Sequence, residues 1–276
     1  MARHSELEMK NQQNRQSYAN EALKLLSTKT PPQGFSPNGF HWARKQALQM
    51  VMGLSRTGAE TAKPEFAQAI QGIIADEKEP LFLRRDAAMA LGFLDPSTIA
   101  NNNKLKPADV CKALANLTLA VLRAGQPRFD PAAPTDLTKP EDVFPQPTED
   151  NKLQFANAVA YYLNCIAVGL GGRDAPQIPK RGLLKAVAGG DAVFQDATTL
   201  LNTHVNPTVT ALTKPNPDSN RLLSDLESKR GPLEQWIKEK GLALPAQDGA
   251  AAPVAGPAGA GAPVAGGALA SPVTPR

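Results

Sequence analysis

The sequence is poor in the residues that most often carry out chemistry. It contains three histidines (His4, His41 and His204) and two cysteines (Cys111 and Cys165). No histidine has a carboxylate, a cysteine or a second histidine at metal-ligand spacing, and no zinc-protease, phosphate-loop or nucleophile-elbow motif occurs. The cysteines are far apart and form neither a CxxC pair nor a disulfide framework. We therefore expect no metal, no cofactor and no catalytic residue.

Other scarcities narrow the class of protein. Aromatic residues make up 5% of the chain, which suits closely packed helices better than a β-sandwich or barrel. The net charge of +4, from 30 basic and 26 acidic residues, is too small for a nucleic-acid-binding footprint and argues against that partner. The polar start lacks the apolar core of a secretory signal, and no run of 18 uncharged apolar residues precedes the tail. We expect a cytoplasmic protein without a membrane span, provided that the start is correctly assigned.

What the sequence does contain is helical periodicity interrupted by proline. Apolar residues recur at helical spacing in two long regions, on either side of a segment that carries five prolines between Gln126 and Gln146. The predicted organisation is a flexible N-terminus (1–16), a helical region (17–125), a Pro-rich loop (126–148), a second helical region (149–241) and a disordered Ala/Gly/Pro-rich tail (242–276). The tail is predicted to be disordered because it lacks the large apolar groups that would offset the entropy of ordering. Pro207 and Pro232 are expected to kink or break their helices.

One stretch, Glu79 to Asp95, has a counterpart 40 residues earlier at Gly39 to Ser55. Each has a basic start, an apolar body and a leucine near its end, and the alignment places Trp42 opposite Phe82 and Leu54 opposite Leu94. A period near 40 in a helical context is typical of stacked helix pairs. The stretch from 151 to 172 has the layout of a degenerate third copy.

The pair of helices over 64–95 resembles a HEAT repeat. Pro64 opens its first helix, and its second helix runs Arg-Arg-Asp-Ala-Ala-Met-Ala-Leu-Gly-Phe-Leu from Arg84 to Leu94, close to the Arg…Ala-Leu-Gly-x-Leu pattern of that family. The resemblance is clear over about 39–95 and extends less fully to 172. It implies an all-α fold, a short HEAT-like α-solenoid of antiparallel helix pairs, and a scaffold that binds other proteins.

Four basic residues are the candidates for contact with a partner. Arg44 and Lys45 align with Arg84 and Arg85, so equivalent positions in the repeat would place all four on one edge of the solenoid, as a ridge for an acidic partner or phosphate groups. The alternative is that they are solvated side chains that pair with Asp86, Glu77 or Glu79.

Three functions follow, in order of preference. The first is a non-enzymatic scaffold that binds a protein partner through its extended surface. The second is a lyase or isomerase on the same scaffold, because HEAT-like arrays also occur in bilin lyases; Cys111 or Cys165 would then accept the ligand, although both are expected to be buried. The third is nucleic-acid binding through the basic ridge. Gly169-Leu170-Gly171-Gly172 follows a helix and is interpreted as a helix cap rather than a phosphate loop.

Overall fold

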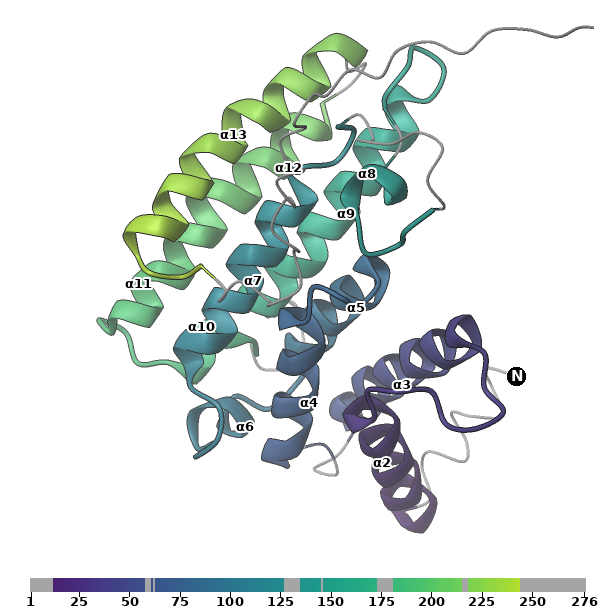
Figure 1. Cartoon of the computed structure of the whole chain (residues 1–276). Coiled ribbons are helices and arrows are strands. Elements are labelled where there is room, and N and C mark those ends of the chain that lie inside the picture. Colours follow the sequence, from purple (N-terminus) through teal and green to yellow (C-terminus); the bar gives the residue numbers. More distant parts are fainter. Residues whose placement is uncertain are drawn as a thin grey trace, which may run out of the picture. The chain divides into compact units, whose positions relative to one another are not determined.

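In the computed structural model, which describes residues 12–57, 61, 63–126, 135–144, 146–172, 181–214 and 218–243, every regular element is a helix (Figure 1). The long helices are α2 (Gln12–Ser27), α3 (Pro37–Thr57), α4 (Pro64–Ala75), α5 (Leu81–Leu91), α7 (Pro107–Val121), α9 (Lys152–Gly171) and α13 (Ser219–Glu239). The short ones are α6 (Ser97–Ala100), α8 (Pro140–Val143) and α10 (Leu183–Ala186), and a continuous run joins α11 (Ala192–Thr199), the π-helical η1 (Leu200–Val205) and α12 (Asn206–Leu212). The all-α prediction is confirmed.

Consecutive long helices pack in pairs and also in two layers. The pairs are α2 with α3, α4 with α5, and α7 with α9. The first members (α2, α4, α7) pack on one another in chain order and form what we call the first layer; the second members (α3, α5, α9) do the same and form the second layer. A single cluster of buried apolar side chains fills the space between the layers. Each helix therefore buries one face against its own partner and another against its neighbours in the layer.

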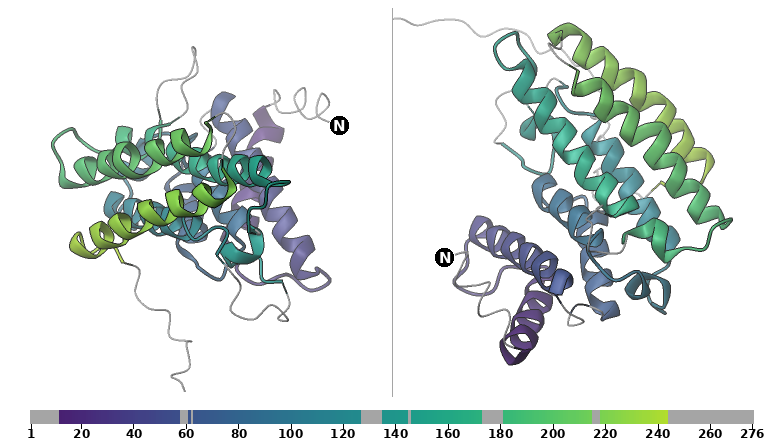
Figure 2. Two further views of the ribbon diagram at one scale, coloured as in Figure 1. Left: turned by 90° about the horizontal axis from the view of Figure 1, so that it is seen from above. Right: turned by 180° about the vertical axis from the view of Figure 1, so that it is seen from behind.

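The last two long elements pack in the reverse order. The run η1–α12 lies on α9, whereas α13 packs mainly on α7 and α11 also contacts α7 (Figure 2). In the preceding pairs, the helix that comes first in the chain packs on the first layer. Here the first member instead continues the second layer for most of its length, so the final pair is not a simple continuation of the earlier ones.

Glycines permit the close crossing of α5 and α9. A side chain at Gly92 would collide with the backbone of Val168, and one at Gly169 would lie 2.6 Å from the carbonyl oxygen of Ala88. Both contacts involve backbone atoms, which cannot move aside as a flexible side chain can. The two helices can therefore approach this closely only because both positions lack a Cβ.

Arg181 fixes the carboxyl ends of the second layer. Its Nη1 donates hydrogen bonds to the carbonyl oxygens of Ser55 (2.6 Å), near the end of α3, and Phe93 (2.5 Å), just beyond α5. The next residue, Gly182, lies against the backbone of Gly172, the cap of α9. One guanidinium thus satisfies carbonyls at two helix ends and lies next to the third. With their carboxyl ends together, α3, α5 and α9 have their amino ends toward a common edge.

The structure corrects the predicted boundaries of two segments. Residues 12–16, expected to be flexible, belong to α2, which begins at Gln12; residues 1–11 lie outside the described part. Within the Pro-rich loop, residues 135–144 are ordered: the amide of Leu81 donates to the carbonyl oxygen of Leu137 (2.8 Å), and Phe144 is buried. Except for Leu242 and Ala243, the predicted tail lies outside the described residues.

Two prolines lie inside helices and break neither. Pro232 was expected to kink or break its helix, and α13 continues through it without a break. The buried stripe Leu226, Leu233 and Ile237 continues across it on one face, and this tertiary burial outweighs the missing backbone hydrogen bond. Pro207 is the second residue of α12, and the wider turn of η1 just before it accommodates the ring: the amide of Asn206 donates to the carbonyl oxygen of Leu201.

One helix in the described part, α9, is long and apolar enough to cross a membrane by length and composition alone. Slightly more than half of its apolar window, 56%, is buried inside the protein against α5, α7 and α12.

Candidate functional site

Two of the four predicted contact residues are buried and do not form a surface ridge. Arg44 and Arg84 are each 2% exposed. Arg44 Nη1 forms an ion pair with Glu79 Oε1 at 2.6 Å, and its guanidinium lies 5.4 Å from the centroid of the Phe40 ring. Arg84 Nε donates to the carbonyl oxygen of Ile74 at 2.9 Å. Both side chains connect a second-layer helix to the elements packed against it and are unavailable to a partner.

The sequence does contain a signal for this burial. Arg44 precedes the buried Ala47, Leu48 and Val51 by three, four and seven residues, which places all four on one helix face. Arg84 stands in the same relation to Ala87, Ala88 and Leu91. Charge alone suggested the surface, whereas the spacing indicated the core.

Arg85 and Lys45 have different environments. Arg85 Nη2 pairs with Asp86 Oδ1 at 2.6 Å, and its guanidinium lies 4.9 Å and 4.6 Å from the ring centroids of Tyr161 and Tyr162. Burial acts to lower the pKa of Arg85, but Asp86 and the two tyrosines outweigh it and raise the pKa. Lys45 is half-buried and makes no ion pair with a described residue. The alternative of pairing with Glu79 and Asp86 therefore holds for two of the arginines, although these pairs are buried rather than solvated.

Exposed apolar side chains lie instead in or beside the amino halves of the second-layer helices. The large hydrophobic residues exposed in the described part are Phe35 (51%), Trp42 (64%), Leu137 (41%), Leu153 (55%) and Tyr161 (49%). The first two flank the start of α3, the third is hydrogen-bonded to the first residue of α5, and the last two lie in the amino half of α9. We call this set the apolar edge. Sequence reasoning missed it because the apolar residues were assigned to the core.

A small cavity opens beside the apolar edge. It has a volume of about 180 Å³ between α8 and the start of α9, with Val143, Phe144, Phe155 and Ala158 among its lining residues. The Phe144 ring meets Tyr162 edge-on, with centroids 4.8 Å apart. Ala158 lies one turn before Tyr161 on the same face of α9, so the cavity and the exposed ring are neighbours.

Neither cysteine is in a reactive environment. Cys111 and Cys165 are buried. Burial, with a smaller contribution from Asp196, raises the pKa of Cys111 to about 12. For Cys165, burial outweighs the opposing effect of Arg85 and raises the pKa to about 11. The thiolate, which is the nucleophilic form, is therefore strongly disfavoured at both positions.

Burial lowers the pKa of both described histidines. Burial lowers the pKa of His41, with Glu79 acting in the opposite direction. His204 is 5% exposed in η1, its ring lies 5.5 Å from that of Trp236, and burial followed by Lys229 lowers its pKa. In the described ranges, no group of three or more His, Cys, Asp or Glu side chains is placed to hold a metal ion.

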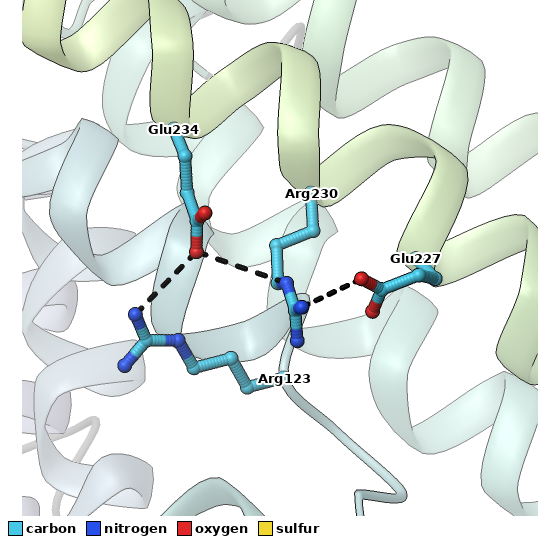
Figure 3. A network of polar contacts seen from close by, with 4 residues as sticks. All are labelled: Arg123, Glu227, Arg230 and Glu234. Atoms are coloured by element: carbon cyan, nitrogen blue, oxygen red, sulfur yellow. Dashed lines mark hydrogen bonds and ion pairs between the residues drawn. The ribbon is translucent and has the colours of Figure 1, made fainter.

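The remaining charged cluster has a structural role. Arg123, just after α7, faces Glu234 of α13 at 3.5 Å, and Arg230 lies between Glu234 (3.7 Å) and Glu227 (2.6 Å) (Figure 3). Because most of these side chains are half exposed, the pairs contribute little individually. They align α13 on α7. Gly172 caps α9 with φ of 77°, as expected for that glycine-rich segment.

Comparison with known proteins gives no further assignment: no family model, no curated protein and no solved structure matches the chain.

Proposed function

We propose that the chain is a HEAT-like helical-repeat protein of the non-enzymatic kind, which binds a protein partner through the apolar edge. The succession of helix pairs supports the repeat assignment, because each pair packs mainly on its neighbours, as in a solenoid. The reversed final pair would then close the array.

The observation that carries the binding proposal is that the large exposed apolar side chains lie in or beside the amino halves of the second-layer helices. Scattered single residues of this kind are normal on a protein surface, but a group that includes Trp and Tyr is typical of an interaction site. Tyr161 is also held by the Arg85 guanidinium, so little side-chain freedom would be lost on binding. The cavity lined by Phe144 and Phe155 offers an adjacent site for an apolar side chain of the partner.

The two other functions have less support in this structure. A thiol-based lyase would need an accessible thiolate, whereas both cysteines are buried. Nucleic-acid binding would need the arginine ridge, whereas Arg44 and Arg84 are 2% exposed. The apolar edge also suits a protein partner better than a phosphate backbone.

The test is site-specific photo-crosslinking in the source cells. A photoreactive phenylalanine analogue placed at Trp42 or Tyr161 should yield a discrete adduct, and the same analogue at the exposed Gln195 of α11 serves as the matched control. With the analogue at Trp42, the adduct should disappear when Tyr161 is changed to alanine, and the reverse should hold with the analogue at Tyr161. The reason is that hot-spot aromatic residues contribute about 2 kcal/mol or more to binding. Equal labelling from Gln195, or no adduct from the apolar edge, would contradict the proposal.

A further inference from the structure

We propose that a second site, a cavity between α2 and α4, binds a lysine or arginine residue of a protein partner. The cavity has a volume of about 280 Å³ and is formed by residues from the end of α2, from α4, from α3 and from the turn between α4 and α5. It shares no lining residue with the apolar edge, so the proposal does not rest on that surface.

Gly72 forms part of the cavity wall, although neither packing nor backbone conformation requires a glycine at this position. Gly72 lies in the interior of α4, where glycine costs about 1 kcal/mol relative to alanine. A Cβ at this position would meet no atom of the protein within 4 Å, and Gly72 is not among the glycines with positive φ. Neither packing nor backbone conformation therefore requires glycine. The missing side chain leaves this part of the cavity wall open to another molecule.

The chemistry of the wall matches a long cationic side chain. Leu26, Ala69 and Ile73 give the cavity an apolar lining, and Glu65 and Asp76 add carboxylates. Lysine and arginine bury an aliphatic stem against apolar surface and keep the charge at a polar rim. A purely apolar side chain would leave the carboxylates unused, and a small inorganic cation would leave the apolar lining unused.

The carboxylates that line the cavity outnumber its cationic side chains by one. Glu79, the third carboxylate of the wall, is neutralised by Arg44 at 2.6 Å. Glu65 and Asp76 form no ion pair with a described residue, and Lys29 is the other cation on the wall.

The direct test is an NMR titration of the ¹⁵N-labelled full-length protein with a minimal probe, acetyl-lysine N-methylamide. The amides of Gly72 and Ala69 should shift and saturate. The norleucine analogue, which has the same stem without the charge, should leave these amides unchanged at equal concentration and ionic strength. No saturable shift with the lysine probe, or the same shift with norleucine, would overturn the proposal.

Variants separate the cavity from general surface charge. Gly72→Leu adds a side chain on the cavity wall, at a position where a Cβ meets no atom within 4 Å, and should weaken binding of the probe by at least about tenfold. Gly231→Leu is the matched control, since Gly231 is also helical and a Cβ there would meet no atom within 4 Å; this variant should bind the probe as the wild type does. Glu65→Gln should weaken binding about two- to fivefold, the usual contribution of an exposed ion pair. Wild-type affinity for the probe in Gly72→Leu would refute the site.

The cavity and the apolar edge can be tested independently. Alanine at Trp42 or Tyr161 should leave the affinity for the probe unchanged, so that either proposal can fail without the other.

Discussion

At the scale of single residues, buried charge distinguishes this protein from an ordinary helical core. The side chains of Arg44, Arg84 and Glu79 are buried between packed helices rather than exposed on their outer surface. Burial lowers the pKa of Arg84, and the carboxylates of Glu77, Asp76 and Glu79 oppose that shift. Because a buried charge is tolerated only with its partners in place, each of these residues constrains the turn between α4 and α5.

Removal of the carboxylate of Glu79 should be strongly destabilising. Glu79→Gln leaves Arg44 as a buried cation without a counter-charge, and we expect the free energy of unfolding to fall by about 3–5 kcal/mol. Urea denaturation followed by circular dichroism measures the change. The double variant Arg44→Met, Glu79→Leu should recover much of the loss, because it removes both charges. A single variant that loses less than about 1 kcal/mol would mean that the pair is solvated in solution.

The thiols should be silent in the folded protein. With pKa values raised to about 12 and about 11, Cys111 and Cys165 should fail to react with Ellman's reagent at pH 8 within minutes, and both should react at once in urea. If a slow reaction with the reagent remains in the native state, the variants Cys111→Ser and Cys165→Ser show which thiol is responsible. Fast reaction of either thiol in the native state would reopen the lyase alternative.

At the scale of elements, the α5–α9 crossing depends on glycine. Gly169→Ala would place a methyl group about 2.6 Å from the carbonyl oxygen of Ala88, and we expect a loss of about 1–3 kcal/mol in the free energy of unfolding. Gly72→Ala is the matched control: it introduces the same methyl group in open space and should be neutral or stabilise α4 by up to about 1 kcal/mol. Equal effects of the two substitutions would argue against a tight crossing.

The π-helical turn η1 should make stability depend on pH. Because burial and Lys229 lower the pKa of His204, the unfolded chain binds more protons than the folded one as pH falls below about 7. The free energy of unfolding should therefore be greatest above that pH and decline toward pH 5. In His204→Gln the decline should be shallower, with His41 supplying the remainder. Parallel pH profiles of urea midpoints would show that His204 is not buried in solution.

Much of the element structure could be predicted from the sequence, for identifiable reasons. The start of α4 at Pro64 and of α7 at Pro107 follows from proline at the first helical turn. Pro232 was misjudged because a local rule cannot register the buried stripe that continues across it. For two of the four candidate residues, Arg44 and Arg84, the expected surface position was wrong, since charge was taken as a sign of exposure. The exposure of Trp42 could not be foreseen, because it depends on which helices cover α3.

At the scale of the whole molecule, packing is almost entirely between neighbours. α2 contacts chiefly α3 and α4, whereas α5 contacts α3, α4, α7 and α9. Arrays of this kind are least protected at an end that has neighbours on one side only. Native-state hydrogen exchange should therefore be faster in α2 than in α5 and α9. Uniform protection across these helices would indicate that the chain unfolds as one cooperative unit.

The position of Arg181 has a consequence during synthesis of the chain. The carbonyl of Ser55 is satisfied by a residue 126 positions later, and that of Phe93 by the same residue 88 positions later. At about 5–20 residues per second, the ribosome needs on the order of 10 s to cover the longer interval. In that time the nascent α3 and α5 have carboxyl ends without this partner. The early helix pairs are therefore expected to emerge with their last turns frayed and to become fixed only when the second half of the chain has been translated.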